Sequence, residues 1–266
     1  MIETHTKYTF ADDHVFCSVL SRDKQLCMDL IALLLDVRVK DITYLNSQQQ
    51  IEGDYDGRGI RLDVYVEDSD AVFDLEMQTV LNRNLAKRSR YYQSLIDQGL
   101  IEKGEDYSKL RKSYIVFICL EDPFQHNLSR YSFRKRCEEV DSLTLGDGTK
   151  TVFLNASGSR CGISPELGSF LDYLLTQKAA DDLTGRIDKQ VEITTSDAIW
   201  RKEHMTLEMK FKEIRDMTRI EVFNNLVKDG TLTVEQAAEK AEMSVSDFIG
   251  EAKEIEKHKK PENTDL

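Results

Sequence analysis

Two carboxylates in the first third of the chain have a spacing that could hold a metal ion. Residues 60–79 alternate apolar and polar side chains on either side of Ser69 and Asp70, which is typical of a β-hairpin. If Ser69 and Asp70 form the turn, Asp63 lies directly opposite Glu76. The alternation therefore predicts a pair of facing carboxylates.

Facing carboxylates need a partner, because directly opposed strand residues have Cβ atoms roughly 4.5–5.5 Å apart. Two such charges repel by about 3 kcal/mol at an effective dielectric constant near 20. A bound Mg²⁺ or Mn²⁺ would remove this cost, since Mg²⁺ is typically held by one or two carboxylates with water and phosphate oxygens. The alternative is an ordinary solvated face of the hairpin, on which Arg61 could neutralise Asp63.

The same register supports the pairing, because it brings six apolar residues together on the other face. A slip of one residue would mix the two faces. The apolar pairs are Leu62 with Met77, Val64 with Leu75, and Val66 with Phe73.

Helices and strands that could position the hairpin follow from hydrophobic periodicity. Helical spacing predicts a helix over residues 12–36 with a break near residues 21–23, and further helices over 82–102 and 166–176. Apolar runs predict buried strands over residues 113–120 and 151–154. From residue 177 the strand signals vanish. We therefore expect an α/β core over residues 1–176, a helical region over 177–258 and a disordered tail over 259–266.

Composition narrows the class of protein. The formal net charge of −12 excludes a surface covered all over with positive charge, although a local basic groove remains compatible with it. The five cysteines are odd in number and none is spaced as C-x-x-C, which favours neither disulfides nor a zinc site. No export signal or membrane span is recognised, so we expect a cytoplasmic protein with reduced thiols.

The hairpin residues carry a family resemblance. Residues 61–66 (Arg-Leu-Asp-Val-Tyr-Val), followed by 74–78 (Asp-Leu-Glu-Met-Gln), resemble the PD-(D/E)XK nuclease superfamily, and more closely its recombination-promoting nuclease (Rpn) transposase-like family. The resemblance covers roughly residues 8–175. Further similar segments lie at residues 12–16, 90–93 and 114–118.

The resemblance implies a restriction-endonuclease-like core, with a central mixed sheet flanked by helices. It implies that Asp63 and Glu76 bind Mg²⁺ or Mn²⁺, and that they act with Gln78 in hydrolysing phosphodiester bonds of DNA. Gln78 stands where the superfamily usually has lysine, so it could orient a water but supply no charge. The competing hypothesis is a DNA- or protein-binding module on a decayed nuclease fold. Glu52 and Asp54 could complete the carboxylate set, although a solvated loop is the favoured interpretation of their segment.

Positive charge after the hairpin predicts a DNA contact. Arg83, Lys87, Arg88 and Arg90 lie on a predicted helix that begins beside the hairpin, and phosphate contacts supply most sequence-independent affinity for DNA. A solvated helix face is the alternative. A second basic stretch, residues 130–136, is less well placed for this role.

The C-terminal helices carry a different expectation. Residues 233–257 have the outline of a helix-turn-helix, but the second helix is acidic, which disfavours entry into a DNA groove. We expect a structural role or contact with a partner, such as a second copy of the chain in a homodimer.

Overall fold

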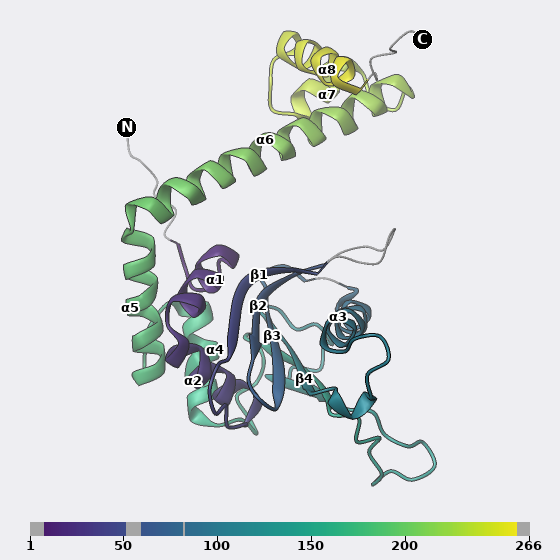
Figure 1. Cartoon of the computed structure of the whole chain (residues 1–266). Helices are drawn as coiled ribbons and strands as arrows, with labels where there is room; N and C mark the ends of the chain where they lie inside the picture. The colour runs from purple at the N-terminus through teal and green to yellow at the C-terminus, as the bar shows by residue number, and fades with distance from the viewer. Residues whose placement is uncertain (1–7, 52–59, 82, 260–266) are drawn as a thin grey trace. The chain divides into compact units, whose positions relative to one another are not determined.

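A six-stranded mixed sheet contains the predicted hairpin (Figure 1). The computed structural model describes residues 8–51, 60–81 and 83–259. The strands lie in the order β1-β2-β3-β4-β6-β5, in which β3, β4 and β6 are parallel neighbours and the other pairs are antiparallel. In chain order the strands are β1 (Tyr44–Ile51), β2 (Ile60–Glu67), β3 (Ala71–Gln78), β4 (Lys112–Cys119), β5 (Arg130–Phe133) and β6 (Thr149–Asn155).

The hairpin of β2 and β3 has the predicted register. Val64 pairs with Leu75 and Val66 with Phe73, as expected for a turn at Ser69 and Asp70. The turn is closed by the amide of Asp68, which donates to the carbonyl of Ala71 at 2.9 Å. The Asp68 carboxylate then accepts from the amides of Asp70 and Ala71, at 2.7 and 3.0 Å. This side chain therefore satisfies the backbone of the turn that sets the register.

The regular alternation of the hairpin breaks at Asp63. The pairing of β2 with β3 extends no further than Val64, and Gln48, which faces Asp63 from β1, has a φ of 61°. Leu62 packs in the apolar cluster that contains Tyr65, so its predicted place on the face of Val64 is wrong. The break separates β2 from β3 at the level of the two carboxylates.

Helices cover both faces of the sheet (Figure 1). Helices α1, α2, α4 and α5 pack together on one face, and α3 lies on the other. The predicted break in the first helix lies at Asp23, whose side chain accepts from the amide of Leu26 at 2.9 Å and so caps α2. The bounds are α1 (Asp13–Arg22), α2 (Lys24–Leu35), α3 (Leu85–Leu100), α4 (Pro165–Thr176) and α5 (Asp182–Ser196), with a short 3₁₀ helix at Tyr107–Lys109.

The space between α3 and the sheet is filled by aromatic and aliphatic side chains. Tyr92 and Ile96 of α3 pack on Ile115 and Phe117 of β4. Phe117 stacks on Phe153 of β6, with ring centroids 5.2 Å apart. This cluster fixes α3 over the strands that carry the candidate site.

A second compact unit begins at residue 198. It contains α6 (Ala198–Lys228), α7 (Val234–Lys240) and α8 (Val245–Lys259), and its own core includes Ile220 and Phe248. The first unit ends at residue 197 and so includes α5, beyond residue 176 where the sequence placed the end of the nuclease core. Of the predicted tail, residues 260–266 lie outside the described residues, as do Glu52 and Asp54.

The sequence predicts reduced, mostly buried thiols. All five are free thiols, and Cys17, Cys27 and Cys119 are buried. Within the described ranges, no helix is long and apolar enough to cross a membrane.

Candidate metal centre

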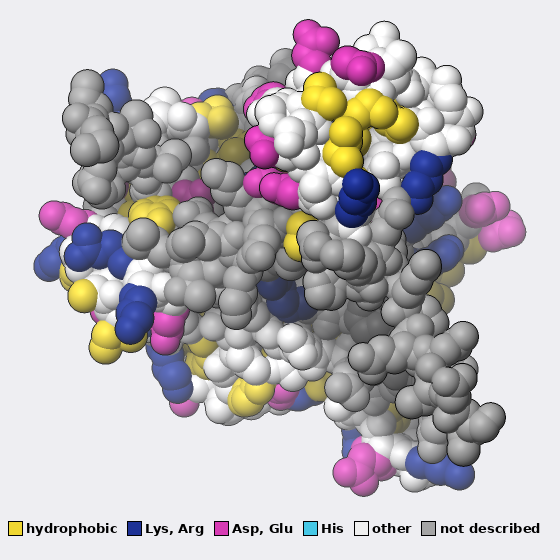
Figure 2. All heavy atoms as spheres, turned by 90° about the horizontal axis from the view of Figure 1, so that it is seen from above, with side chains coloured by type: hydrophobic (Ala, Val, Ile, Leu, Met, Phe, Trp, Pro, Cys, Tyr) yellow, Lys and Arg dark blue, Asp and Glu magenta, His cyan; other side chains and the backbone are white. Residues whose placement is uncertain are grey.

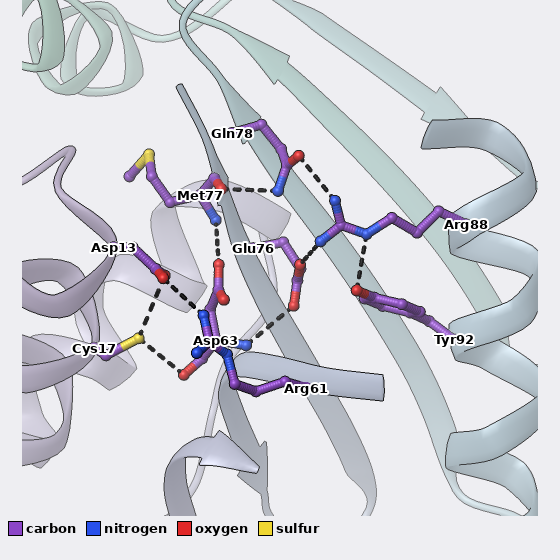
Figure 3. A network of polar contacts seen from close by, with 9 residues as sticks. All are labelled: Asp13, Cys17, Arg61, Asp63, Glu76, Met77, Gln78, Arg88 and Tyr92. Atoms are coloured by element: carbon purple, nitrogen blue, oxygen red, sulfur yellow. Dashed lines mark hydrogen bonds and ion pairs between the residues drawn. The ribbon is translucent and has the colours of Figure 1, made fainter. Parts of the chain in front are cut away.

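Asp63 of β2 and Glu76 of β3 are both buried, with 7% and 0% of their surfaces exposed. Each carboxylate binds the backbone of the opposite strand: the amide of Asp63 donates to Glu76 Oε1, and the amide of Met77 donates to Asp63 Oδ2, both at 3.0 Å. These two contacts cross the gap where the regular pairing stops (Figure 3). Burial excludes the solvated hairpin face that the sequence left open as an alternative.

Helix α1 brings a third carboxylate to the pair. Oxygen or sulfur atoms of Asp13, Cys17 and Asp63 lie within 4.8 Å of one another. The thiol of Cys17 donates to the carbonyl of Asp63 at 3.1 Å, and Arg61 binds Asp13 at 2.9 Å. Arg61 therefore pairs with Asp13, whereas the sequence suggested Asp63 as its partner.

Of this cluster, the carboxylates are better metal ligands than the thiol. Burial, together with Asp63 and Asp13, raises the pKa of Cys17, so the sulfur keeps its proton. Mg²⁺ prefers oxygen ligands and retains several waters. Asp13, at 39% side-chain exposure, is the most open of the three carboxylates and lies in the first turn of its helix. The oxygen donors of Asp13 and Asp63 therefore fit Mg²⁺ or Mn²⁺, and Glu76, which accepts from the amide of Asp63, lies outside the group of atoms within 4.8 Å of one another.

Arg88 of α3 closes the other side of the site (Figure 3). It forms an ion pair with Glu76, donates to Gln78 Oε1 at 3.0 Å and donates to the Tyr92 hydroxyl at 2.8 Å. The guanidinium also lies 5.0 Å from the centre of the Tyr92 ring. The side-chain amide of Gln78 donates to the carbonyl of Met77 at 2.8 Å, so both ends of this amide are held.

The buried acidic groups raise each other's pKa values. Burial, and next the charge of Asp13, raises the pKa of Asp63 to about 7. Burial, and next the charge of Asp63, raises the pKa of Glu76 to about 8, although Arg88 acts in the opposite direction. Both carboxyls therefore hold protons more tightly than exposed carboxyls do. A divalent cation would reverse this effect, because it stabilises the ionised form.

Asp74 is a further buried acid on the same face of β3. Its surface is 1% exposed, and among the residues that the structure describes neither carboxylate oxygen has a hydrogen-bond partner. Burial, and next the charge of Glu76, raises its pKa well above the ordinary value. Burial therefore favours the neutral, protonated form of Asp74.

The four cations predicted to contact DNA divide into two groups. Arg83, Lys87 and Arg90 are exposed on or beside α3, whereas Arg88 points into the site. On the face drawn in Figure 2, basic side chains are interspersed with acidic ones and cover no broad area.

Comparison with known protein families shows to which family the chain belongs. Residues 10–156 match the model of the PD-(D/E)XK nuclease family transposases, which is more than half of the chain. The chain therefore belongs to this family. No curated protein and no solved structure matches it. The family confirms the predicted resemblance and the mixed-sheet nuclease core.

Sequence reasoning missed Asp13 as a member of the site. No spacing rule connects it to Asp63, which lies 50 residues further along the chain. The segment 12–16 entered only as part of the family resemblance, and the neighbouring Asp12 and Asp13 could not be told apart. The fold selects Asp13, because the helix that begins there places it one turn before Cys17, against β2.

Proposed function

We propose that this protein is a divalent-metal-dependent DNA endonuclease that hydrolyses phosphodiester bonds. The observation that carries the proposal is the convergence of Asp63, Glu76 and Asp13 from three elements into one partly buried site. Membership in the nuclease family supports the same reaction class. Like charges gathered under burial are costly, and Arg61 and Arg88 offset this cost only in part, since the pKa values of Asp63 and Glu76 stay raised; a bound divalent cation would remove it.

Asp63, Glu76 and Asp13 would hold Mg²⁺ or Mn²⁺. When bound, such a cation polarises the scissile phosphate and lowers the pKa of a bound water. The protein's own task is to fix the carboxylate oxygens, which the amides of Met77 and Asp63 do from the opposite strand. The thiol of Cys17, which donates to the carbonyl of Asp63, holds α1 against β2.

Arg88 and Gln78 would act as positioning residues. The guanidinium of Arg88 offsets the negative charge of Glu76 and restrains the Gln78 amide through one hydrogen bond. Gln78 is neutral, so Arg88 supplies positive charge on this side of the site. Gln78 would then orient a water or a phosphate oxygen by hydrogen bonding.

The exposed cations of α3 would bind the DNA backbone. Lys87 and Arg90 lie on the helix that also carries Arg88, and Arg83 lies just before this helix, so the three exposed cations lie along the element that reaches the proposed centre. Their contacts would be independent of base sequence, because phosphates carry no sequence information.

A cleavage assay tests the proposal. Supercoiled plasmid is incubated with the protein and EDTA, Mg²⁺, Mn²⁺ or Ca²⁺, and nicked and linear products are quantified. We expect cleavage with Mg²⁺ or Mn²⁺, with a loss of more than about hundredfold in Asp63→Asn or Glu76→Gln. The exposed turn residue provides the control, since Asp70→Asn removes a carboxylate outside the site.

Intact plasmid in every metal, with folded wild-type protein, would favour the binding module on a decayed nuclease fold. Cleavage that survives in both Asp63→Asn and Glu76→Gln would place the chemistry elsewhere. A cytoplasmic location, a homodimer formed through the C-terminal helices and a role in recombination stay predictions.

A further inference from the structure

A polar pocket lies at the amino ends of β4 and β6, far along these strands from Asp63 and Glu76. Its volume is about 260 Å³. The loop that connects β5 to β6 forms one wall, and it includes an antiparallel bridge between Arg136 and Thr144. The pocket is lined by Lys112, Tyr114, Arg134, Lys135, Thr144 and residues 146–150.

Positive charge dominates this pocket, although the chain as a whole is acidic. Four cations and one carboxylate line it, in a protein of net charge −12. The carboxylate is Asp147, which binds Lys135 at 2.7 Å and accepts from the amide of Thr149 at 3.1 Å. Asp147 is therefore committed to Lys135 and the turn, which leaves Lys112, Arg134 and Lys150 to face the cavity.

The cations lie close enough to disfavour one another. Lys150 is partly buried, and its pKa is lowered by burial first and then by Arg130 and Arg134, while Asp36 acts in the opposite direction. Lys112 and Arg134 are exposed, so the cost of converging charge falls on the half-buried Lys150, and a bound anion would remove it.

The pocket is separate from the candidate metal centre. Glu76 pairs with Phe117 in the register of β3 and β4, whereas the pocket residue Lys112 pairs with Ala71. Phe117 lies five positions after Lys112 along β4, which corresponds to a distance of about 17 Å along the strand. Side chains alternate along β4, so Lys112 and Tyr114 point to the face opposite that of Phe117.

We propose that this pocket binds a phosphate group, either of a nucleic-acid backbone or of a small phosphorylated molecule. The guanidinium of Arg134 can bind two phosphate oxygens at once, and Lys112 and Lys150 add point charges. Tyr114 stacks on Phe73, with ring centroids 5.3 Å apart, and provides a flat wall for an attached sugar. The volume is below the range of about 300–1,000 Å³ for drug-sized ligands, which fits one phosphate and its nearest sugar.

Titration with two probes tests the proposal. Sodium pyrophosphate is titrated by calorimetry and a short DNA duplex by fluorescence anisotropy, both with EDTA present so that no divalent metal bridges phosphate to protein. The pocket variant combines Arg134→Gln with Lys150→Gln. The control combines Lys103→Gln with Lys178→Gln, which removes the same charge from exposed sites outside the pocket.

We expect the pocket variant to bind at least one probe about tenfold or more weakly than the control does. Weaker binding of pyrophosphate assigns the pocket to small phosphorylated ligands, and weaker binding of the duplex alone assigns it to a nucleic-acid backbone. The proposal is overturned if variant and control bind both probes equally, or if the wild type binds neither. Thermal unfolding of every variant shows that each is folded, and no step depends on cleavage.

Discussion

At the scale of single residues, the site is governed by how buried acids share charge. Asp63 and Glu76 lie where β2 and β3 separate, and each binds the backbone of the opposite strand. The fold thus fixes two carboxyl groups whose pKa values are raised in the absence of a bound cation. Proton release and metal binding should therefore be linked.

The affinity for a divalent cation is expected to rise with pH. The pKa of Asp63 is about 7 and that of Glu76 about 8, so both carboxyls are largely protonated below pH 7 and must lose their protons when the metal binds. Below the pKa of a ligand carboxyl, the metal affinity rises about tenfold for each unit of pH increase, for every proton that the metal displaces. Titration of Mn²⁺ by calorimetry between about pH 6 and pH 9 measures this. An affinity that does not change over this interval would contradict the assigned ligands.

Arg88 gives a second test at this scale. Arg88→Met removes the cation that faces Glu76, which should weaken Mn²⁺ binding by about tenfold, within the range seen for residues that orient metal ligands. Arg90→Met is the matched control, because it removes the same charge from an exposed position on the same helix. Equal metal affinities in the two variants would show that Arg88 has no part in the centre.

At the scale of elements, the hairpin was readable from sequence because both of its signals are local. Alternation predicted the two strands, and the turn at Ser69 and Asp70 predicted the register, which the structure confirms from Val64 to Glu67 but not at Asp63, where the direct pairing with Glu76 is absent. The Asp63 break was not readable, since it arises where β1, β3 and α1 converge on one residue. Short-range patterns cannot describe such a convergence.

Asp68→Ala should destabilise the hairpin turn. The buried side chain accepts from the amides of Asp70 and Ala71, so its loss leaves two backbone donors without this partner. We expect the free energy of unfolding to fall by about 1–3 kcal/mol. Asp70→Ala, which removes an exposed ion pair with Lys40, should cost clearly less than Asp68→Ala does. Urea unfolding compares the two, and equal losses would contradict the turn's role.

Helix α3 carries the test of DNA contact. If Arg83, Lys87 and Arg90 each bind a phosphate, replacing all three by Gln should lower the slope of log affinity against log salt by about 2.7. Anisotropy with a DNA duplex and Ca²⁺ at several salt concentrations measures the slope. A slope equal to that of the wild type would mean that Arg83, Lys87 and Arg90 belong to an ordinary solvated face.

Strand β5 was not predicted, and helix α5 was predicted only as an undivided part of the helical region over residues 177–258. Strand β5 has only four residues, and three of them are polar or exposed. It lies at the sheet edge and pairs with β6 alone, so its sequence carries no run of buried apolar residues. Helix α5 has a mostly polar sequence and buries few side chains, among them Ile187 and Val191, so its periodicity is weak. Both depend on neighbours that are distant in sequence, and so does the recruitment of Asp13.

At the scale of the whole molecule, every residue of the proposed centre belongs to the first unit. A chain ending at residue 197 should therefore unfold cooperatively and bind Mn²⁺ within about threefold of the full-length affinity, because its core is complete. Calorimetric titration and thermal unfolding of the truncated protein test this. A truncated protein that folds but loses Mn²⁺ binding would show that α6–α8 contribute to the site.

The most direct test of the central claim is an anomalous difference map from a crystal grown with Mn²⁺ and a short DNA duplex. We expect a peak about 2.1 Å from carboxylate oxygens of Asp63 and Glu76, with a phosphate oxygen of the duplex beside it. An absent peak at a saturating concentration of Mn²⁺, or a peak held only by other residues, would contradict the claim that these two carboxylates form the metal centre of a nuclease.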